Sequence, residues 1–464
     1  MTTAERYDAI LIGAGQANNS LSRALAQAGW SVALIERAHV GGTCVNEGCT
    51  PTKTMVASAR VAHLTHRAPD YGVDTGPPTT DMTTVRERKR SIVESFRTGS
   101  RRRIEETPGV DLLMGEARFA GPRLVDVQLN DGSRRQLTAE RLFINVGQRP
   151  RVPDLPGLRD VPSLNSTTIM ELDVVPEHLL VLGGGYVGVE FAQMFRRFGS
   201  AVSVVQRSEQ VLNQEDADVA AEVVSILNED GIEVLLNSEA LDVKEDAEGR
   251  IQLRVRTPEG DRVLSGSHLL VAVGRVPNTK RLNLAAAGIE TDPRGYIQVD
   301  ERLATSVPGV YALGDVTGGP AFTHMSYDDY RIIRNNLLDG GDATTTDRLV
   351  PYVVFIDPQL GGVGLTERQA RKRGLEVQVA KMPMSRVARA LEVDEPRGLM
   401  KVIVDGKTDR ILGATILAVE GGEVMAILQT AMMGDLPYTV LRDAVFAHPT
   451  LAESLNNLFA MLGE

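Results

Sequence analysis

The sequence predicts an α/β protein with two doubly wound domains followed by a C-terminal α+β domain. The main observation is a unit of apolar strand, glycine-rich turn, helix and second apolar strand, which is typical of a parallel sheet. This unit occurs twice, about 170 residues apart, over 7–13, 16–29 and 31–35 and again over 178–183, 187–199 and 202–205. A further observation is that the pattern changes near residue 346 to strands with long helices near 421–434 and 450–462.

Stretches rich in Pro and Gly at 148–157 and 274–278 are typical of linkers. Between the two units, residues 83–106 have the pattern of a long charged helix, in which Arg101, Arg102 and Arg103 are expected to face solvent. We expect residues 1–150 to form the first part of one doubly wound domain and residues 151–275 to form the second doubly wound domain. Residues 276–345 are expected to form a central part that belongs with the first domain, and residues 346–464 the C-terminal domain.

Composition excludes several classes of function. The formal net charge is −11 and aromatic residues make up 4% of the chain, so the chain is expected to repel nucleic acid and to offer few platforms for stacked bases. No window approaches the length of an apolar membrane span, and the N-terminal residues lack the pattern of a secretory signal. We therefore expect a cytoplasmic protein with neither a nucleic-acid nor a membrane partner.

The first glycine-rich turn predicts a dinucleotide phosphate site. Gly13 and Gly15 permit a tight turn at a helix N-terminus, which Gln16 and Ala17 begin. Asn18 stands where a third glycine is expected, which weakens the match. Glu36 lies 23 residues after Gly13, at the end of a strand, where a carboxylate can accept hydrogen bonds from a ribose diol.

The second turn is a full match, with Gly183, Gly185 and Gly188. Here the acid at the strand end is replaced by Gln206, followed by Arg207. A carboxylate at that place repels a 2′-phosphate, whereas an amide and an arginine suit it. The second site is therefore predicted to bind NADPH, with NADH as the alternative. After two such turns, Gly314 and Asp315, which follow a strand, are interpreted as a further contact to a ribityl chain.

The chain has two cysteines, Cys44 and Cys49, in the segment Gly41-Gly42-Thr43-Cys44-Val45-Asn46-Glu47-Gly48-Cys49-Thr50-Pro51-Thr52-Lys53. A tetrahedral zinc site would need two further ligands, and this segment has no histidine. Residues five apart in a regular helix are too distant for a disulfide, so we expect a distorted helix start, supported by Pro51. A helix N-terminus also lowers the pKa of a thiol. The pair is predicted to be redox-active.

This segment resembles that of the class I pyridine nucleotide–disulfide oxidoreductases, which include dihydrolipoamide dehydrogenase, glutathione reductase and mercuric reductase. The resemblance covers the whole chain. It implies an FAD-binding domain, an NAD(P)H-binding domain, a central domain and a C-terminal dimerisation domain, with the active site completed across a homodimer.

The resemblance also implies residue roles. Cys49 would be the thiol beside the flavin and Cys44 the thiol that faces substrate. Lys53 and Glu190 would form an ion pair near the flavin, and Tyr186 would cover the nicotinamide pocket. His448 and Glu453 would form an acid–base dyad that comes from the other subunit. The cofactor contacts expected beyond the two glycine-rich turns are Gly42, Thr43, Lys53, Ala117, Gly147, Gly274, Gly314 and Asp315.

Several segments narrow the resemblance. No cysteine follows Cys49, whereas mercuric reductases have a C-terminal pair, so efficient mercury reduction is not expected. The segments 322–331, 350–355 and 436–443 are similar to a reactive-chlorine-resistance flavoprotein subfamily that is linked to copper reduction. That subfamily is expected to favour NADH, which conflicts with Gln206 and Arg207, so the choice of nucleotide stays open.

Three hypotheses remain for the function. The chain is interpreted first as a reductase of a small disulfide or an oxidised, thiol-reactive substrate. The alternatives are a Cu(II) or Hg(II) reductase that uses the same cysteines, and a dihydrolipoamide dehydrogenase-like subunit of a larger complex or a redox sensor. No resident metal is expected. His324 and Met325 are candidate soft ligands for which packing is the favoured role, and Met382 and Met384 are expected in a core.

Overall fold

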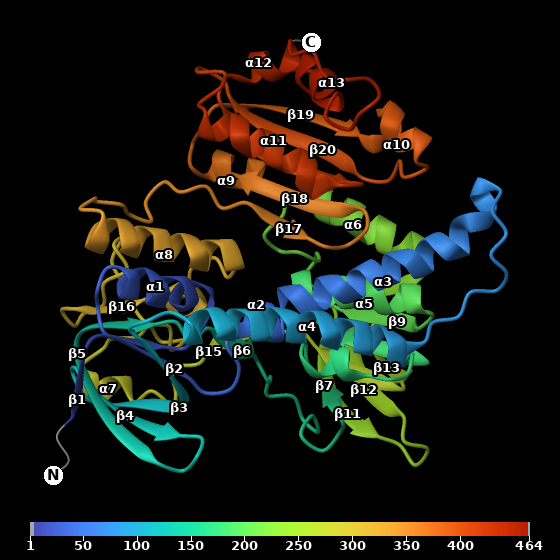
Figure 1. The fold of residues 1–464 in the computed structure, drawn as a ribbon. Helices are drawn as coiled ribbons and strands as arrows, with labels where there is room; N and C mark the ends of the chain where they lie inside the picture. Colours follow the sequence, from blue (N-terminus) through green and yellow to red (C-terminus); the bar gives the residue numbers. More distant parts are fainter. Residues whose placement is uncertain (1–3, 463–464) are drawn as a thin grey trace. The chain divides into compact units, whose positions relative to one another are not determined.

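The computed structural model describes residues 4–462. The chain forms two compact units, each assembled from segments that are distant in sequence (Figure 1). The first unit contains Met1–Thr54, Thr84–Arg151 and Gly274–Arg348, and the second contains Met55–Thr83, Val152–Val273 and Leu349–Glu464. Two of these divisions fall within the Pro/Gly-rich stretches 148–157 and 274–278. The three domain boundaries expected from the sequence stay a prediction.

The first unit contains a mixed sheet. Its strands are β1 (Glu5–Ile12), β2 (Val32–Glu36), β3 (Val110–Gly121), β4 (Leu124–Leu129), β5 (Arg134–Ile144) and β16 (Val310–Ala312). The parallel part has the order β3-β2-β1-β5-β16. Residues 115–121 of β3 and 134–138 of β5 pair antiparallel with β4. In this register Ile12 lies opposite both Ile35 and Ile144. Gly13 and Asn145, which follow β1 and β5, and Glu36, the last residue of β2, therefore meet at the end where these parallel strands finish.

Helices complete the first unit. They are α1 (Gln16–Gln27), α2 (Gly42–Asn46), α7 (Leu284–Ala287), α8 (Thr323–Leu338) and the 3₁₀ turn η3 (Gly314–Thr317), with the short antiparallel pair β6 (Gln148–Pro150) and β15 (Arg275–Pro277). Helices α1 and α8 pack side by side, and their apolar faces share a core that includes Leu21, Leu25, Ile332 and Ile333. Two further helices, α3 (Cys49–Arg67) and α4 (Met82–Glu105), contribute residues to both units.

The second unit repeats the doubly wound arrangement. Its parallel sheet has the order β10-β9-β8-β14-β7, with β7 (Ser163–Leu164), β8 (His178–Leu182), β9 (Ala201–Val205), β10 (Ile232–Leu235) and β14 (His268–Val271). Its helices are α5 (Tyr186–Phe198) and α6 (Ala217–Glu229), and an antiparallel sheet is formed by β11 (Glu239–Glu245), β12 (Ile251–Thr257) and β13 (Gly260–Gly266). Leu182 lies opposite Val205 and Val271, so Gly183 and Gln206 meet at the sheet edge as their counterparts do in the first unit.

The C-terminal part of the second unit is an antiparallel sheet with helices. The strands follow the order β17-β18-β21-β20-β19, with β17 (Tyr352–Val354), β18 (Gln359–Gly364), β19 (Val377–Pro383), β20 (Leu399–Asp405) and β21 (Ile411–Ala418). The helices are α9 (Glu367–Lys372), α10 (Ala388–Glu392), α11 (Gly421–Met433), α12 (Tyr438–Arg442) and α13 (Ser454–Ala460). Met382 and Met384 are buried in its core, which confirms their expected role.

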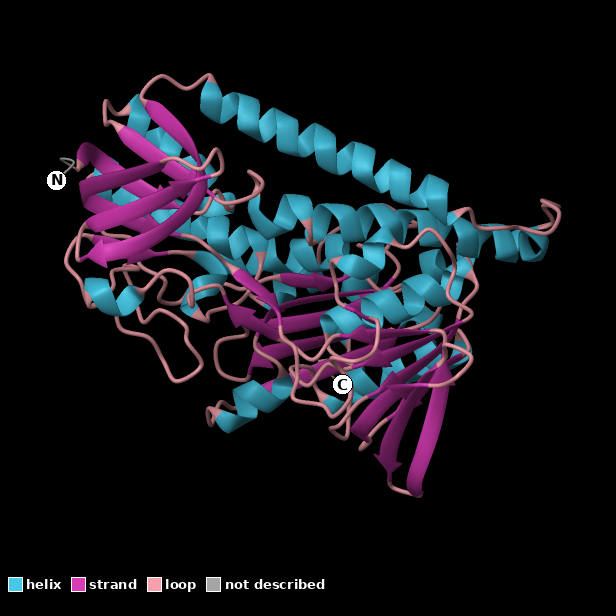
Figure 2. Ribbon diagram, turned by 90° about the horizontal axis from the view of Figure 1, so that it is seen from below, coloured by secondary structure: helices cyan, strands magenta, loops and turns pink. Residues whose placement is uncertain are grey.

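The predicted elements are confirmed in type, with shifted ends. Both strand–helix–strand units and the long helix α4 are present, and Arg101, Arg102 and Arg103 are exposed on α4 as expected. The last helix is shorter than predicted: α13 covers only 454–460 of the expected 450–462. Figure 2 shows the same helices and strands coloured by type. Over residues 4–462, no helix is both long enough and apolar enough to span a bilayer.

Candidate active site

The two cysteines lie in separate helical segments. Cys44 belongs to α2, and Cys49 is the first residue of α3. The helical path breaks at Glu47, whose φ of −141° is far from the helical value. The expected distortion is therefore present. It lies at Glu47 and Gly48, whereas Pro51 is inside the first turn of α3, where proline is tolerated.

Two glycines attach the cysteine segment to the first glycine-rich turn. Gly41 and Gly42 have φ values of +104° and +62°, which favour glycine. A Cβ atom at Gly42 would lie 2.8 Å from the Cα of Gly15. The backbone N–H of Gly41 donates to the carbonyl of Ala14 at 2.9 Å, and Nε2 of Gln16 donates to the carbonyl of Gly41 at 2.8 Å. The phosphate turn and the cysteine segment thus form one local structure.

The two thiols differ in their protonation. The hydrogen bond between them raises the pKa of Cys44, with burial adding to the effect. The same hydrogen bond lowers the pKa of Cys49, with help from Thr323 and the positive charge of Lys53 and against the effect of burial, and the pKa that results is about 6. A reduced pair at neutral pH therefore carries its negative charge on Cys49 and its proton on Cys44. This asymmetry agrees with the roles that the family resemblance implies.

Thr323 is a contact that the sequence did not reveal. Its Oγ1 lies 3.2 Å from Sγ of Cys49, although the two residues are 274 positions apart in sequence. The sequence draws attention to the neighbours His324 and Met325 instead. Met325 is buried, which fits the favoured packing role. The exposed ring of His324 stacks on Phe322 with centroids 5.4 Å apart.

The first glycine-rich turn has the geometry of a phosphate loop. Gly15 precedes the first residue of α1, so Gln16 and Ala17 supply backbone donors of its first turn. Glu36 accepts hydrogen bonds from the backbone N–H of Ala14 at 2.9 Å and of Ala38 at 2.8 Å. The carboxylate is therefore held at the end of β2, beside the loop.

Asn18 takes over the packing role of the missing glycine. It is fully buried in α1, and its Nδ2 donates to the carbonyls of Ile12 at 3.3 Å, Gly13 at 2.9 Å and Phe143 at 3.2 Å. Asparagine at this position therefore links the helix to the ends of two strands. The departure from the glycine pattern does not disturb the loop.

The surroundings of this loop fit FAD. A Cβ at Gly15 would lie 2.3 Å from Oδ1 of Asn145, and a Cβ at Gly314, whose φ is +71°, would lie 2.6 Å from Oγ of Ser326. The Oδ1 atom of Asn145 is buried, and among residues 4–462 it has no hydrogen-bond partner. Gly15 and Gly314 therefore let the backbone pack closely at the start of α1, whose free N–H groups are the donors that the phosphates of a dinucleotide require.

The other expected FAD contacts lie in the same unit. Asp315 follows Gly314 in η3, and burial raises the pKa of its carboxyl group. A Cβ at Gly147 would lie 3.9 Å from Oγ1 of Thr43, so these two expected contacts are neighbours. Ala117 is buried on β3 opposite Val127. Gly274 begins the return to the first unit, where its carbonyl accepts from the N–H of Arg151 at 2.9 Å.

The second glycine-rich turn has the same architecture with a neutral side chain at the strand end. The backbone N–H of Gly184 donates to Oε1 of Gln206 at 2.9 Å. Arg207 is exposed. Gly183 has φ +109°, and a Cβ at Gly188 would lie 1.9 Å from the carbonyl oxygen of Gly183. Gly188 is therefore required for close packing of helix on strand.

Tyr186 contacts two residues that the sequence did not single out. Its ring stacks on Tyr352 with centroids 5.8 Å apart, and its hydroxyl lies 3.1 Å from Oε1 of Glu215. The hydroxyl of Tyr352 lies 2.8 Å from both carboxylate oxygens of Glu215. Burial raises the pKa of Glu215. One turn further along α5, Oε1 of Glu190 accepts from the N–H of Phe355 at 2.7 Å. Lys53 lies in the first unit and Glu190 in the second, and their ion pair stays a prediction.

The structure brings His448 and Glu453 together. Nδ1 of His448 lies 3.0 and 2.9 Å from the two carboxylate oxygens of Glu453. A carboxylate on Nδ1 fixes the tautomer and leaves Nε2 available for proton transfer. The side chain of His448 is 67% exposed, so it can reach another molecule.

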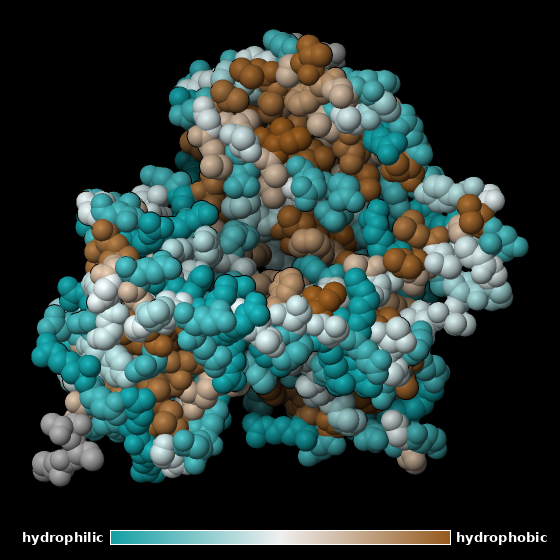
Figure 3. Space-filling model, in the orientation of Figure 1, coloured by the Kyte–Doolittle hydropathy of each residue, from teal (hydrophilic) through white to brown (hydrophobic). Residues whose placement is uncertain are grey.

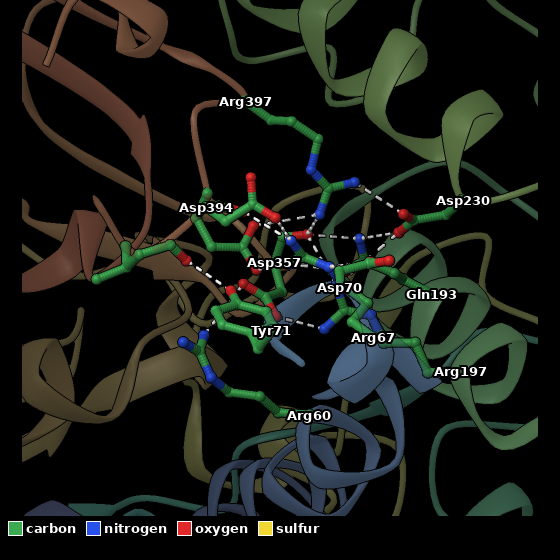
Figure 4. Close-up of polar contacts among 12 residues, drawn as sticks. Arg60, Arg67, Asp70, Tyr71, Gln193, Arg197, Asp230, Asp357, Asp394 and Arg397 are labelled. Carbon is green, nitrogen blue, oxygen red and sulfur yellow. Dashed lines mark hydrogen bonds and ion pairs between the residues drawn. The ribbon is translucent and has the colours of Figure 1, made fainter. Parts of the chain in front are cut away.

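A buried ionic cluster fastens the parts of the second unit around Asp357 (Figure 4). Asp357 is paired with Arg197 of α5 and with Arg60 of α3, the latter at 3.1 Å. Arg397 binds Asp230 at 2.8 Å, and Arg67 binds Glu395 at 2.6 Å. A buried charge that lacks a partner of opposite charge is strongly destabilising, so each of these side chains needs its ion pair. The cluster therefore fixes the C-terminal half of α3 against the C-terminal sheet.

Beside this cluster lies a cavity of about 670 Å³. Its lining includes Leu64, Tyr71 and Val73 on one side and Val393, Val419 and Leu451 on the other. Leu64, Tyr71 and Val73 are exposed, as are Met433, Val440 and Val445 of the C-terminal part. Figure 3 shows hydrophobic side chains gathered over the C-terminal part, at the top of the view.

Among residues 4–462, no cluster of three His, Cys, Asp or Glu side chains has the arrangement of a metal site.

Known proteins are similar to this chain over nearly its whole length. Residues 7–329 match the family "pyridine nucleotide-disulphide oxidoreductase", and residues 350–459 match its dimerisation domain. A probable pyridine nucleotide-disulfide oxidoreductase of Escherichia coli (strain K12), RclA, is 40% identical over 461 residues, which cover 98% of this chain and 99% of RclA. A mercuric reductase of Streptomyces lividans is 36% identical over 450 residues, which cover 97% of this chain and 94% of that enzyme.

Solved structures agree with the sequence matches. The Cu(II) complex of the HOCl-induced flavoprotein disulfide reductase RclA from Escherichia coli superposes with a TM-score of 0.89 at 39% identity, covering 99% of this chain and 100% of that one. A second structure of RclA, whose description does not mention copper, superposes with a TM-score of 0.88 at 39% identity. The match covers 98% of this chain and 100% of that one. The chain therefore belongs to the pyridine nucleotide-disulphide oxidoreductase family, as a flavoprotein oxidoreductase that uses FAD and a pyridine nucleotide and carries the family's dimerisation domain.

Proposed function

We propose that the chain passes electrons from NADPH through FAD to the Cys44–Cys49 pair and on to a small disulfide or another oxidised, thiol-reactive substrate in the cytoplasm. The observation that carries this proposal is the asymmetry of the two thiols. Cys49 begins a helix and has a lowered pKa, whereas Cys44 retains its proton. One sulfur is thus suited to hold negative charge beside the cofactor and the other to exchange with substrate.

The chain's own residues support a balanced reaction, NADPH + H⁺ + RSSR → NADP⁺ + 2 RSH. When bound, FAD supplies the transfer of an electron pair from nicotinamide to the cysteine pair. Cys44, deprotonated by His448, attacks one substrate sulfur and forms a mixed disulfide. The leaving thiolate takes the proton back from His448. Cys49 then attacks Sγ of Cys44, which closes the Cys44–Cys49 disulfide and releases the second thiolate, and this thiolate takes up the H⁺ of the equation from solvent.

A second candidate function is Cu(II) reduction, NADPH + 2 Cu(II) → NADP⁺ + 2 Cu(I) + H⁺. It is favoured by the solved relative described as a Cu(II) complex. Thiolates are ligands that suit Cu(I), and here both cysteines lie in one short segment. Hg(II) is a related substrate of the mercuric reductases that the chain resembles.

The deciding experiment follows NADPH and NADH consumption by wild type, Cys44→Ser and Cys49→Ser. Small disulfides, Cu(II) and Hg(II) serve as acceptors, and a Cu(I)-specific chelating dye detects the copper product. We expect turnover of a disulfide by wild type and none by Cys44→Ser, while NADPH still reduces the bound FAD in that variant. Disulfide turnover by Cys44→Ser at the wild-type rate would refute the thiol route. Copper turnover without disulfide turnover would select the second function.

The exposed His448–Glu453 dyad leads us to infer that it serves the cysteine pair of the partner in a homodimer. Mixed dimers of Cys44→Ser and His448→Ala subunits test this directly. If the dyad acts across the interface, each mixed dimer contains one intact site and regains activity that neither parent has. If the dyad acts within its own subunit, the mixed dimers stay inactive.

A further inference from the structure

The first residues of two helices are in contact through their side chains. Cys49 is the first residue of α3, and Thr323, whose Oγ1 lies 3.2 Å from Sγ of Cys49, is the first residue of α8. The first turn of a helix has backbone N–H groups without intrahelical partners and a partial positive charge. Helix α8 has 16 residues, which is long enough for this effect. Sγ of Cys49 therefore meets the hydroxyl of Thr323, and each of the two residues stands in the first turn of a helix.

Buried contacts fix the start of α8. Asp329, six residues after Thr323 on α8, is 2% exposed, and its Oδ2 accepts from the backbone N–H of Gly314 at 2.7 Å. Its Oδ1 accepts from Arg348 at 2.6 Å. Nδ2 of Asn145 donates to the carbonyl of Leu313, next to Gly314, at 2.7 Å. These hydrogen bonds join the loop expected to contact FAD to helix α8, and they hold the helix that carries Thr323 in place.

We propose that Thr323 is a further catalytic residue, whose hydroxyl donates a hydrogen bond to the Cys49 thiolate and keeps the negative charge of the reduced pair on that sulfur. This inference rests on the proposed function, in which Cys49 faces the cofactor. A hydroxyl that donates to a thiolate stabilises the charged form and leaves the neutral thiol unfavoured. With the charge held at Cys49, the proton stays on Cys44, and His448 must remove it before Cys44 attacks substrate.

The contact has a simpler alternative, which is that Thr323 only fills space at the start of α8. Thr323→Val and Thr323→Ser separate the two explanations. Valine keeps the shape of threonine and removes the hydroxyl, while serine keeps the hydroxyl and removes the methyl group. A role in packing predicts that serine is the more harmful change, whereas a role in hydrogen bonding predicts that valine is.

The test measures how fast iodoacetamide alkylates Cys49 as a function of pH, in the FAD-loaded, reduced and oxygen-free enzyme. Tandem mass spectrometry of the peptide that contains both cysteines assigns the label to each sulfur. In Thr323→Val we expect the pH midpoint for Cys49 to rise by about one unit, the size expected for a lost hydrogen bond to a charged group. Thr323→Ser should match wild type. The long-wavelength absorbance of the thiolate against FAD should shift in parallel.

An unchanged midpoint in Thr323→Val would overturn the proposal, and so would an equal shift in both variants. If the valine variant does not fold by circular dichroism, Thr323→Ala replaces it, with the same expected shift. The failure of this inference is distinct from that of the proposed function. The proposed function fails if wild type does not reduce its FAD with either nucleotide, whereas this inference is judged from the alkylation profile of Cys49.

Discussion

The two glycine-rich turns share one backbone plan but differ in how each position is used. At the strand end, Glu36 accepts from the N–H of Ala14 and Gln206 accepts from that of Gly184, both at 2.9 Å. The two side chains occupy equivalent places, and one carries a charge that the other lacks. The shared hydrogen bond stabilises the turn in both places. The charge is not needed for that hydrogen bond, so it can differ between the two turns and determine which ligand binds.

The third position of the motif differs more deeply. In the second turn, Gly188 leaves no space for a side chain, since a Cβ there would lie 1.9 Å from the carbonyl oxygen of Gly183. In the first turn, Asn18 fills that position and donates to three carbonyls. The third glycine of the motif therefore indicates where a helix packs closely against a strand. A buried asparagine at that position can also hold the helix against the strand, by hydrogen bonds to the strand's carbonyl groups.

The largest expected effect is that of Gly188→Ala. Its Cβ would overlap a backbone oxygen that cannot move aside, so we expect a loss of about 3 kcal/mol of stability. Calorimetric unfolding measures this loss, together with nucleotide binding, which should fail while FAD is retained. Gly185→Ala is the matched control, because a Cβ there has no atom within 4 Å and should leave the unfolding temperature unchanged. Equal stability of the two variants would contradict the comparison.

Asn18→Gly tests the first turn from the opposite side. The change restores the expected motif but removes the donor from three buried carbonyls, so we expect a destabilisation of about 2 kcal/mol and faster release of FAD. Urea unfolding and the fluorescence of released FAD give the two measurements. If the glycine variant is as stable as wild type and holds FAD equally well, the amide is dispensable and the first turn tolerates either residue.

The smallest expected effect is that of Gln206→Glu, which gives the second turn the charge of the first. A carboxylate can keep the hydrogen bond from Gly184 while repelling a 2′-phosphate. We expect kcat/KM for NADPH to fall by about tenfold, which corresponds to ~1.4 kcal/mol, with little change for NADH. Arg207→Gln provides the companion change, since it removes a positive charge and keeps the turn. A wild-type preference for NADH that Gln206→Glu leaves unaltered would show that this position does not select the nucleotide.

Much of the fold followed from local patterns. Both strand–helix–strand units, the long helix α4 and the cysteine segment were recognisable because apolar runs, glycines and cysteines leave a record within a short window of sequence. The start of α13 was misplaced because the apolar residues Leu451 and Ala452 extend the helical pattern into the turn at 451–453 that precedes the helix. The break between the cysteines was predicted from their spacing, but its position at Glu47 and Gly48 was not.

The contacts that distinguish the site were beyond the sequence. Thr323 reaches Cys49 from 274 residues away, and Glu215 meets Tyr352 from 137 residues away. Threonine, glutamate and tyrosine are common residues with no pattern that marks them, so only the paths of strands and helices bring them together.

The sequence by itself determined the class of chemistry: two dinucleotide turns, a pair of cysteines and a histidine with its carboxylate, all encoded within short segments where spacing dictates geometry. The tertiary structure alone decided which sulfur carries the charge. That difference depends first on the hydrogen bond between the two thiols, and then on the Thr323 hydroxyl, which a distant segment supplies, and on the charge of Lys53, because the electrostatic environment of a thiol is the sum of everything packed around it.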